Sequence, residues 1–440
     1  MHHPFNLFKF IFCTLLFINS ILCYDPSKRK FHNSVIIDDR LLIFNGITDT
    51  STYSLELFYL DLSKSFDNNK LTWTSIPEGS LPVYTWVATA VLSLDNSTIY
   101  LYGGFMINKD TSDYDFSNLV YTYNYSTSTW STPKPKLGGD TVPARQYIKG
   151  VIDNSGIIYI FGGYNVSNLT TNIGYLYNDM NILNTVSNTW TTLSISGDLP
   201  TICGEYTADI LPSGIIVYIG GMEKVSYYAA SFTLVNINKI KLFDTNKYEW
   251  SQMNATGDEI DSRICFTSVL TPDGYIIIFG GSTYATTDAD LSSVNPKLAI
   301  LNTNKNPFEW SIPSDSEINS PPSIYGHTAN LYNDLMIITF GFNLDTQFFS
   351  SSGQVYLYNI KSNKWVTTFG PSPSPSPSSS PKPSTTPTLN SSSKALAIGL
   401  GTGIGGAVLV SCIFIAIFVY RRRADQLRQQ PNILQIPSSN

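Results

Sequence analysis

Tryptophan recurs along this chain at nearly constant intervals, and each recurrence follows a short apolar segment that ends in a glycine doublet or its remnant. The six tryptophans are Trp73, Trp130, Trp190, Trp250, Trp310 and Trp365, spaced 57, 60, 60, 60 and 55 residues apart. The intact doublets are Gly103-Gly104, Gly162-Gly163, Gly220-Gly221 and Gly280-Gly281, with remnants at Asn45-Gly46 and Gly341-Phe342. A period this regular predicts an array of equal structural units.

Each unit is expected to form four β-strands. In the fourth repeat, apolar and β-branched segments cover 206–211, 215–219 and 239–243, and a fourth segment opens at Trp250. Gly, Pro, Asn and Asp bound these segments, which is typical of strands joined by turns. The stretches between repeats lack sustained helical periodicity, so folds that alternate strands with helices are not expected.

The two repeated features have different expected roles. The glycine doublet predicts a tight bend at the end of the second strand, where neighbouring sheets approach closely. The tryptophan carries more apolar surface than a single sheet can bury, so we expect it to lie between adjacent sheets.

These features resemble the kelch-repeat family. The resemblance rests on the doublets, the downstream tryptophans and segments such as Pro143-Ala-Arg145 and Gly326-His327-Thr328-Ala329, and it covers residues 31–369. It implies an all-β, six-bladed kelch-type β-propeller, distantly similar to the propeller of galactose-oxidase-like proteins. By the same resemblance, the first strand of each blade lines a central channel and the tryptophan strand is outermost. Which terminal strand closes the ring stays open.

The flanking segments predict a membrane-anchored protein. Residues 1–23 hold one charge and an apolar stretch, which indicates a secretory signal peptide, although an uncleaved anchor is the alternative. The ectodomain is expected to span 24–369, and the Pro- and Ser-rich residues 370–393 to form an extended stalk. Residues 394–420 predict a single transmembrane helix, and 421–440 a short basic cytoplasmic tail.

The arginines that follow the apolar segment set the expected orientation. Arg421, Arg422 and Arg423 belong on the cytoplasmic side of a membrane, which places the propeller outside the cell. The expected location is therefore the plasma membrane, as a single-pass type I protein.

Glycine spacing within the predicted membrane helix matches that of contacts between paired membrane helices. Gly399 with Gly403, and Gly401 with Gly405, have the four-residue spacing that lets two helices approach closely. A homodimer through these glycines and a glycine-rich helix without a partner both remain open.

Charge excludes one class of partner. The chain carries a net charge of −6, and without Lys9 and the basic tail the remaining residues carry −10. The ectodomain has only four arginines, Arg29, Arg40, Arg145 and Arg263. A chain this acidic is not expected to bind nucleic acid or phosphate.

The sequence also offers modification sites and two ectodomain cysteines. Sequons for N-glycosylation occur in predicted loops or the stalk, at Asn96, Asn124, Asn165, Asn168, Asn254 and Asn390. Cys203 and Cys265 begin the inner segments of neighbouring repeats. A disulfide between them and two buried free thiols both remain open.

Candidate chemistry is sparse. By resemblance to copper radical oxidases, a copper site would need two His and two Tyr ligands, and the ectodomain offers only His32 and His327. No arginine cluster suggests a sialidase, and the acidic stretches 110–115 and 288–290 lack the spacing of calcium loops. We therefore expect no catalytic residues, no metal site and no cofactor.

Aromatic residues in the segments after the doublets point to binding instead. The ligand-binding candidates are Tyr114, Phe116, Tyr284, Phe348 and Phe349, and further aromatics in these segments are Tyr175, Tyr177, Tyr227 and Tyr228. Aromatic side chains on scaffold loops commonly form recognition sites. The sequence predicts a cell-surface glycoprotein that binds an extracellular protein or glycan. The alternatives are a copper-dependent surface oxidase and a passive cell-wall or coat glycoprotein.

Overall fold

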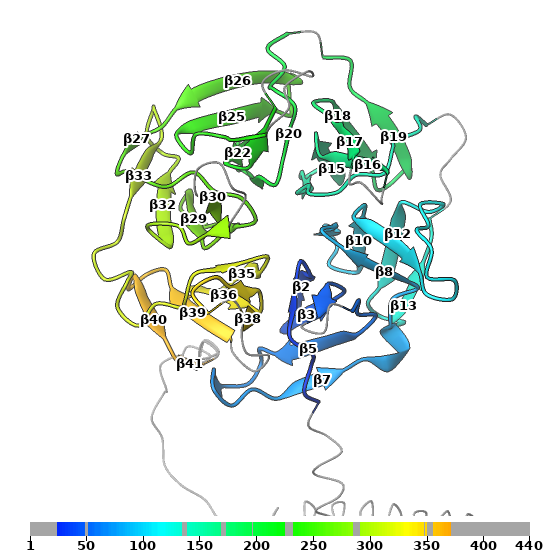
Figure 1. The fold of residues 1–440 in the computed structure, drawn as a ribbon, viewed down its shortest axis with the longest axis horizontal. Helices are drawn as coiled ribbons and strands as arrows, with labels where there is room; N and C mark the ends of the chain where they lie inside the picture. The colour runs from blue at the N-terminus through cyan, green and yellow to red at the C-terminus, as the bar shows by residue number, and fades with distance from the viewer. Residues whose placement is uncertain are drawn as a thin grey trace, which may run out of the picture. The chain divides into compact units, whose positions relative to one another are not determined.

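The structure is a computed structural model in which six sheets stand around a central axis (Figure 1). It describes residues 24–48, 52–133, 139–168, 173–195, 197–224, 232–284, 291–346, 348–349 and 355–370; at 167, 168, 173, 284, 348 and 349 it describes only the backbone. Each sheet is one blade whose four main strands come from a single repeat. The predicted kelch-like, all-β propeller is confirmed.

The main strands follow one another from the axis to the rim in every blade. The innermost are β2 (Asn33–Ile37), β9 (Thr89–Leu92), β14 (Val151–Ile152), β21 (Thr207–Ile210), β28 (Thr267–Leu270) and β35 (Thr328–Tyr332). The second are β3 (Arg40–Phe44), β10 (Thr98–Tyr102), β15 (Ile157–Phe161), β22 (Ile215–Ile219), β29 (Tyr275–Phe279) and β36 (Leu335–Thr339). The third are β5 (Leu57–Asp61), β12 (Val120–Asn124), β18 (Met180–Asn184), β25 (Lys239–Asp244), β32 (Leu298–Asn302) and β39 (Val355–Asn359). The outermost are β7 (Trp73–Ser75), β13 (Thr129–Ser131), β19 (Thr189–Thr192), β26 (Glu249–Asn254), β33 (Glu309–Ser311) and β40 (Lys364–Val366).

Burial explains why the second strands are apolar at consecutive positions. In β15, β22 and β29 every residue after the first is buried, so side chains on both faces of the strand are covered. A strand buried on both faces needs a continuous apolar run rather than an alternating one. The neighbouring blades provide this cover.

Apolar clusters hold the ring together, and within the described residues each of the six junctions between blades has one. The tryptophans lie in these clusters, as predicted. The Trp130 ring lies 5.1 Å from Tyr123 of its own blade and 5.7 Å from Phe44 of the preceding blade. Trp73 lies 5.8 Å from Phe340, across the junction between the last and first blades. Each indole therefore joins its own blade to the preceding one.

The doublets form the predicted bends, with one correction. The first residue of each pair has φ between 53° and 69°, and the second between 87° and 101°. In the sixth repeat the residues with these angles are Phe340 and Gly341, so the predicted remnant Gly341-Phe342 was wrong by one position. A non-glycine residue tolerates the left-handed helical angles of the first position, as Asn45 and Phe340 do. All six second positions are glycine.

The segments after the doublets, predicted as loops, fold into short strands. They pair with segments that precede the innermost strands, or with each other, and form a second tier over the blades. The pairs are β1 (Arg29–Lys30) with β4 (Ile47–Thr48), β8 (Val83–Trp86) with β11 (Phe105–Asn108), β16 (Tyr164–Asn168) with β17 (Ile173–Leu176), and β30 (Thr283–Tyr284) with β31 (Leu291–Ser292). Three-stranded sets join β20 (Cys203–Gly204), β23 (Met222–Glu223) and β24 (Thr233–Leu234), and β34 (Ile324–Tyr325), β37 (Phe342–Asn343) and β38 (Phe348–Phe349).

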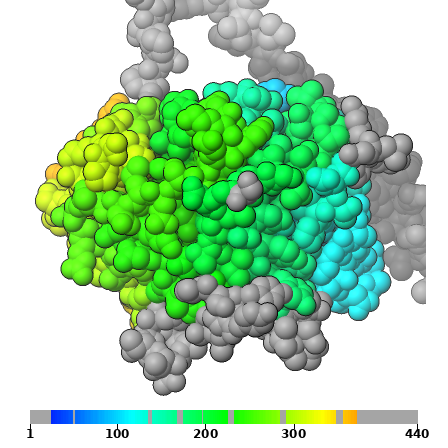
Figure 2. All heavy atoms as spheres, turned by 90° about the horizontal axis from the view of Figure 1, so that it is seen from above, coloured from blue at the N-terminus to red at the C-terminus, as the bar shows by residue number. Residues whose placement is uncertain are grey.

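The ring closes without exchange of a main strand. β2 contacts β35 directly, so the first and last blades are neighbours at the axis. At the rim, β41 (Thr368–Phe369) leaves the last blade and pairs with β6 (Phe66–Asp67) of the first. β27 (Thr256–Gly257) likewise extends from the fourth repeat onto β33 of the fifth blade. Figure 2 shows the ring from its edge, with the green fourth blade facing the viewer.

The predicted flanking segments lie outside the described residues. This applies to the signal peptide, the stalk, the transmembrane helix with its glycine pairs, and the basic tail. Within the described part of the chain, no helix is long and apolar enough to cross a membrane.

Candidate functional site

Strand direction divides the propeller into two faces. Because the four main strands of a blade are antiparallel, the connections after the second and fourth strands emerge on one face. We call this the loop face, and it carries the second tier. The connections after the first and third strands form the opposite face.

Two of the five predicted ligand-binding residues lie together on the loop face. Tyr114 is 39% exposed, and its ring stacks with that of Phe116 at 6.2 Å. Phe116 also packs against the apolar cluster between the first two blades. Tyr284 belongs to β30, and Phe348 and Phe349 to β38, but their side chains are outside the described part of the structure.

A larger aromatic group on the same face was not predicted. Tyr53 stacks on Trp86 at 4.3 Å with an interplanar angle of 11°, and Trp86 stacks on Phe105 at 5.0 Å. Phe105 contacts both Tyr114, at 6.4 Å, and Tyr147, at 6.3 Å. These five residues form an aromatic band across the first three blades. Trp86 is the one tryptophan outside the repeat pattern. This exception is the feature of the sequence that could have indicated the aromatic band.

The other predicted loop-face aromatics have varied positions. Tyr175 is 50% exposed, whereas Tyr177 lies beneath the guanidinium of Arg145, 4.1 Å from its ring centroid. Tyr227 and Tyr228 fall outside the described residues.

Six residues at one repeat position surround the mouth of the central channel. This mouth belt consists of Phe31, Val87, Tyr147, Glu205, Cys265 and Gly326, all with φ between 49° and 64°. Backbone N–H groups of five of them donate to the carbonyl of the belt residue in the preceding blade, at N···O distances of 2.7–3.3 Å. Left-handed angles are costly for Val87 in particular, because its side chain is β-branched. The chain of hydrogen bonds fixes these conformations and thereby the directions of the side chains.

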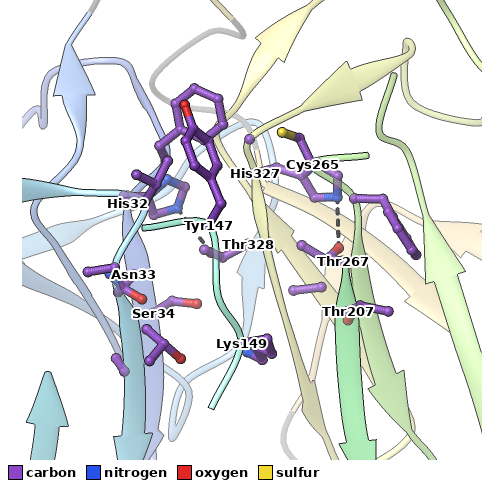
Figure 3. A pocket seen from close by; sticks show the side chains of 18 of the residues that line it. His32, Asn33, Ser34, Tyr147, Lys149, Thr207, Cys265, Thr267, His327 and Thr328 are labelled. Atoms are coloured by element: carbon purple, nitrogen blue, oxygen red, sulfur yellow. Dashed lines mark hydrogen bonds between the residues drawn. The ribbon is translucent and has the colours of Figure 1, made fainter. Parts of the chain in front are cut away.

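Below the belt, the innermost strands enclose a cavity of about 170 Å³. In Figure 3, Tyr147 lies above Lys149, between the His32 segment and the strand that carries Thr267. Hydroxyl groups of Thr267 and Thr328 hydrogen bond to His327 and His32 at 2.8 and 2.9 Å. The cavity is thus polar below its mouth.

Glu205 and Cys265 are the ionisable members of the belt besides Tyr147, and they come from consecutive blades. The Cys265 Sγ–H donates to Glu205 Oε2 at 3.1 Å. Burial raises the pKa of the Glu205 carboxyl to about 7, although the thiol hydrogen bond opposes the shift. Burial, and then the adjacent carboxylate, raise the pKa of the Cys265 thiol well above its usual value. A protonated thiol is a poor nucleophile, so this pair does not form an activated catalytic cysteine.

The histidines are equally unsuited to acid–base chemistry near neutral pH. Burial lowers the pKa of His327 to about 3, and burial followed by the charge of Arg29 lowers that of His32. Both rings are therefore neutral. Within the described residues, no group of three or more His, Cys, Asp or Glu side chains lies close enough together to hold a metal ion.

Three buried arginines support the loop face from below. Arg29, Arg145 and Arg263 have no exposed surface. Arg145 also forms a bidentate pair with Asp179 at 2.6 and 2.7 Å. Each guanidinium donates to the carbonyl of a doublet's first residue: Arg29 to Asn45, Arg145 to Gly162 and Arg263 to Gly280. Because the guanidinium groups of these three arginines are buried and hydrogen bonded to the protein itself, they do not form an anion-binding surface.

The glycosylation and cysteine sites take defined positions where they are described. Asn96, Asn124 and Asn254 are exposed, and Asn165 is half-buried. The prediction that all sequons lie in loops was wrong for four sites: Asn124 and Asn254 end β12 and β26, and Asn165 and Asn168 belong to β16. The two described cysteines, Cys203 and Cys265, are free thiols. Asn390 lies outside the described residues.

Comparison with known proteins identifies the repeats. The domain family described as "KLHDC2/KLHL20/DRC7 Kelch-repeats domain" matches residues 20–221 and 212–391. The solved structure of YjhT covers 79% of this chain and 99% of its own, with a TM-score of 0.56 and 14% sequence identity. That likeness concerns the fold alone.

Curated relatives are moderately similar in sequence. Kelch domain-containing protein 3 from Bos taurus is 26% identical over 262 residues, which are 58% of this chain and 64% of that protein. The chain therefore spans less than two thirds of that relative. A kelch repeat-containing protein from Arthroderma benhamiae is 22% identical and covers 78% of this chain and 57% of its own length. N-(sulfonatooxy)prop-2-enimidothioate sulfolyase from Thlaspi arvense is 25% identical over 58% of this chain and 71% of that enzyme.

Proposed function

The chain belongs to the KLHDC2/KLHL20/DRC7 family of kelch-repeat domains, and on that premise we propose that its loop face binds an extracellular protein or glycan without catalysing a reaction. The aromatic band is the observation that carries the proposal. Tyr53, Trp86 and Phe105 hold one another in a stack, and Tyr114 extends from the stack into solvent. Rings fixed before binding lose little conformational freedom when a partner arrives.

Charge limits the chemistry of the partner. Without Lys9 and the basic tail the chain carries a net charge of −10, and three of the four ectodomain arginines are buried. The fourth, Arg40, lies over the ring of Tyr59 at 4.5 Å. A neutral glycan or a basic protein surface fits this face better than an anionic partner does.

The proposed location is the cell surface, with the propeller outside and a single membrane span. The support is the order of segments in the sequence: an apolar leader, the propeller, a Pro- and Ser-rich stalk, an uncharged segment and three arginines. Protease treatment of intact cells should remove the propeller and leave the basic tail attached to the membrane. A tail that is digested before the propeller would contradict this orientation.

A binding screen tests the function. The soluble ectodomain, residues 24–369, contains every strand that closes the ring and should bind saturably to a secreted protein or a glycan. Joint replacement of Tyr114 and Phe116 by alanine should weaken that interaction about tenfold or more, because contact area at the band is lost. Full binding by this variant would show that the band is not the recognition surface.

The relative from Thlaspi arvense supports an enzyme as the second candidate. Assays of the purified chain for sulfolyase activity, and for copper content with hydrogen peroxide production, distinguish the enzyme alternatives from a binding protein. A chain that shows no saturable ligand and no turnover would instead support the passive coat alternative.

A further inference from the structure

The mouth belt places one carboxylate at the channel entrance in an apolar setting. Glu205 has its N–H bonded to the Tyr147 carbonyl at 2.9 Å, so its backbone is held by the neighbouring blade. Part of its surface remains accessible from the channel, while protein atoms surround the side chain. Glu205 also lines an apolar pocket of about 170 Å³ with Tyr164 and Phe232. The neighbours of Glu205 in the belt are Tyr147, whose ring is mainly apolar, and Cys265.

This carboxylate lacks a counter-ion in the described part of the chain. Its hydrogen-bond partner there is the Cys265 thiol, which is a weak donor. Lys149, deeper in the channel, interacts electrostatically with Asp209. The ammonium of Lys30 donates to the Tyr325 hydroxyl at 2.9 Å, lies 5.4 Å from the centroid of the Phe31 ring and interacts electrostatically with Cys265. The buried carboxylate has lost contact with water and accepts only one weak hydrogen bond in return. A cation that binds beside it would therefore be stabilised by its negative charge.

We propose that the channel mouth binds an alkylammonium group, with Glu205 as its counter-ion and the ring of Tyr147 as its aromatic wall. The inference rests on the proposed function, because the mouth opens on the loop face. Phe31 and Tyr147 meet edge to face at 6.5 Å, and Gly326 contributes no side chain to the belt. An ammonium group can approach a ring face favourably, and its methylene stem suits the apolar side chains.

The donor set favours a monovalent organic cation over a metal ion. One carboxylate and one protonated thiol supply too few hard ligands for calcium or magnesium. A second ammonium deeper in the channel is disfavoured by Lys149, which limits entry to the mouth.

Protonation of Glu205 should control binding. Since burial raises its pKa to about 7, the carboxylate loses its charge as pH falls from 8 to 6. The other ionisable groups around the mouth and the channel are Cys265, Tyr147, Tyr206, His32, His327, Lys30, Lys149 and Asp209. Burial lowers the pKa of both histidines, so neither gains a proton between pH 8 and 6. The Cys265 thiol stays protonated across this range because its pKa is raised well above its usual value. Alkylammonium binding should therefore weaken toward pH 6.

The test uses n-butylammonium as the probe and the full-length chain in detergent. Saturation-transfer NMR titration should show saturable binding at pH 8 that is about tenfold weaker at pH 5.5 and in Glu205→Gln. The neutral isostere n-butanol should bind about tenfold more weakly than the ammonium. Glu249→Gln, which changes an exposed carboxylate on β26, should bind the probe as the unmodified chain does. Cys265→Ser keeps a hydrogen-bond donor and should also retain binding.

Absence of n-butylammonium binding at pH 8, equal binding of n-butanol, or unchanged binding in Glu205→Gln would each overturn the inference. N-acetyl-lysine N-methylamide distinguishes the source of the ammonium: binding comparable to the probe indicates a lysine side chain of a partner protein, and much weaker binding indicates a free small amine. The proposed function can fail separately, since Tyr114→Ala should impair partner binding without affecting the probe.

Discussion

At the scale of single residues, glycine is required at the second position of each doublet by two separate constraints. Gly221 has φ of 88°, outside the left-handed helical angles that Asn45 adopts at the first position. A Cβ atom at Gly221 would also lie 2.4 Å from the carbonyl oxygen of Gly204, which belongs to the backbone and cannot move aside easily.

Gly221→Ala should therefore lower the free energy of unfolding by about 2–4 kcal/mol, measured by urea denaturation. The matched change is Asn45→Gly, at a position whose φ of 57° suits glycine. It removes the hydrogen bond from the Asn33 N–H to Asn45 Oδ1, at 2.8 Å, and should cost about 1 kcal/mol. Equal losses in the two variants would contradict the backbone argument.

Glu205 should make stability depend on pH. Its pKa is about 7 in the folded chain and 4.5 as the ordinary reference, so the folded chain holds the proton more tightly. The stabilising contribution of the protonated group is complete below pH 4.5 and is lost as pH rises through 7. Glu205→Gln removes this dependence on pH. The free energy of unfolding of the variant, minus that of the unmodified chain, should therefore rise by up to about 3 kcal/mol between pH 4.5 and 8. A constant difference across that range would contradict the shifted pKa.

The sequence places the mouth-belt residues at one repeat position but does not predict that they form a hydrogen-bonded ring. Glu205 and Cys265 stand 60 residues apart, one repeat period, so aligned repeats place them at equivalent positions. The hydrogen bonds that join the belt run between backbone atoms of different blades. They leave no residue preference strong enough to recognise, because Phe, Val, Tyr, Glu, Cys and Gly all occupy the position.

At the scale of strands and blades, the tryptophans were predictable because their size requires a second sheet to cover them. The second tier was not predictable in the same way. Its strands are two to five residues long, and four of its six sets include a strand that lies directly before the innermost strand of the blade. Pairs so short lack the apolar alternation by which strands are recognised. The sequence therefore predicted which segments form the loop face, but it did not predict that these segments pair as strands.

Trp310 provides the test of blade packing. Its side chain is 1% exposed and lies in the cluster between the fourth and fifth blades. Trp310→Ala should lower the free energy of unfolding by about 3–5 kcal/mol in urea denaturation. Val186→Ala, at an 84% exposed position, should change it by less than about 0.5 kcal/mol. A small effect at Trp310 would mean that the blades do not depend on their shared indole.

At the scale of the whole molecule, β41, the last of the described strands, closes the ring. Phe369 is 2% exposed and stacks on Phe66 at 4.9 Å, which joins the last repeat to the first blade. The sequence did not show which strand closes the ring. Each repeat runs from an inner strand to an outer one, so a strand from either end of the array could have paired with the blade at the other end. The structure assigns this role to two residues beyond the last main strand.

Phe369→Ala should lower the free energy of unfolding by about 3 kcal/mol or more, since it leaves a cavity at the closing junction. Thr368→Ala, at the exposed neighbour in the same strand, should have an effect of less than about 0.5 kcal/mol. Thermal denaturation followed by circular dichroism compares the two. If Phe369→Ala is as stable as Thr368→Ala, the contact between β41 and β6 does not hold the ring closed.

The two faces of the propeller offer a matched pair of tyrosines. Tyr114 is 39% exposed on the loop face, and Tyr248 is 42% exposed between the third and fourth strands of its blade, on the opposite face. The decisive measurement is the dissociation constant of the first ligand found by the ectodomain screen, for the unmodified chain, Tyr114→Ala and Tyr248→Ala. Recognition by the loop face predicts at least about tenfold weaker binding for Tyr114→Ala and less than about twofold change for Tyr248→Ala. Loss of binding only in Tyr248→Ala would place the recognition surface on the opposite face and contradict the account.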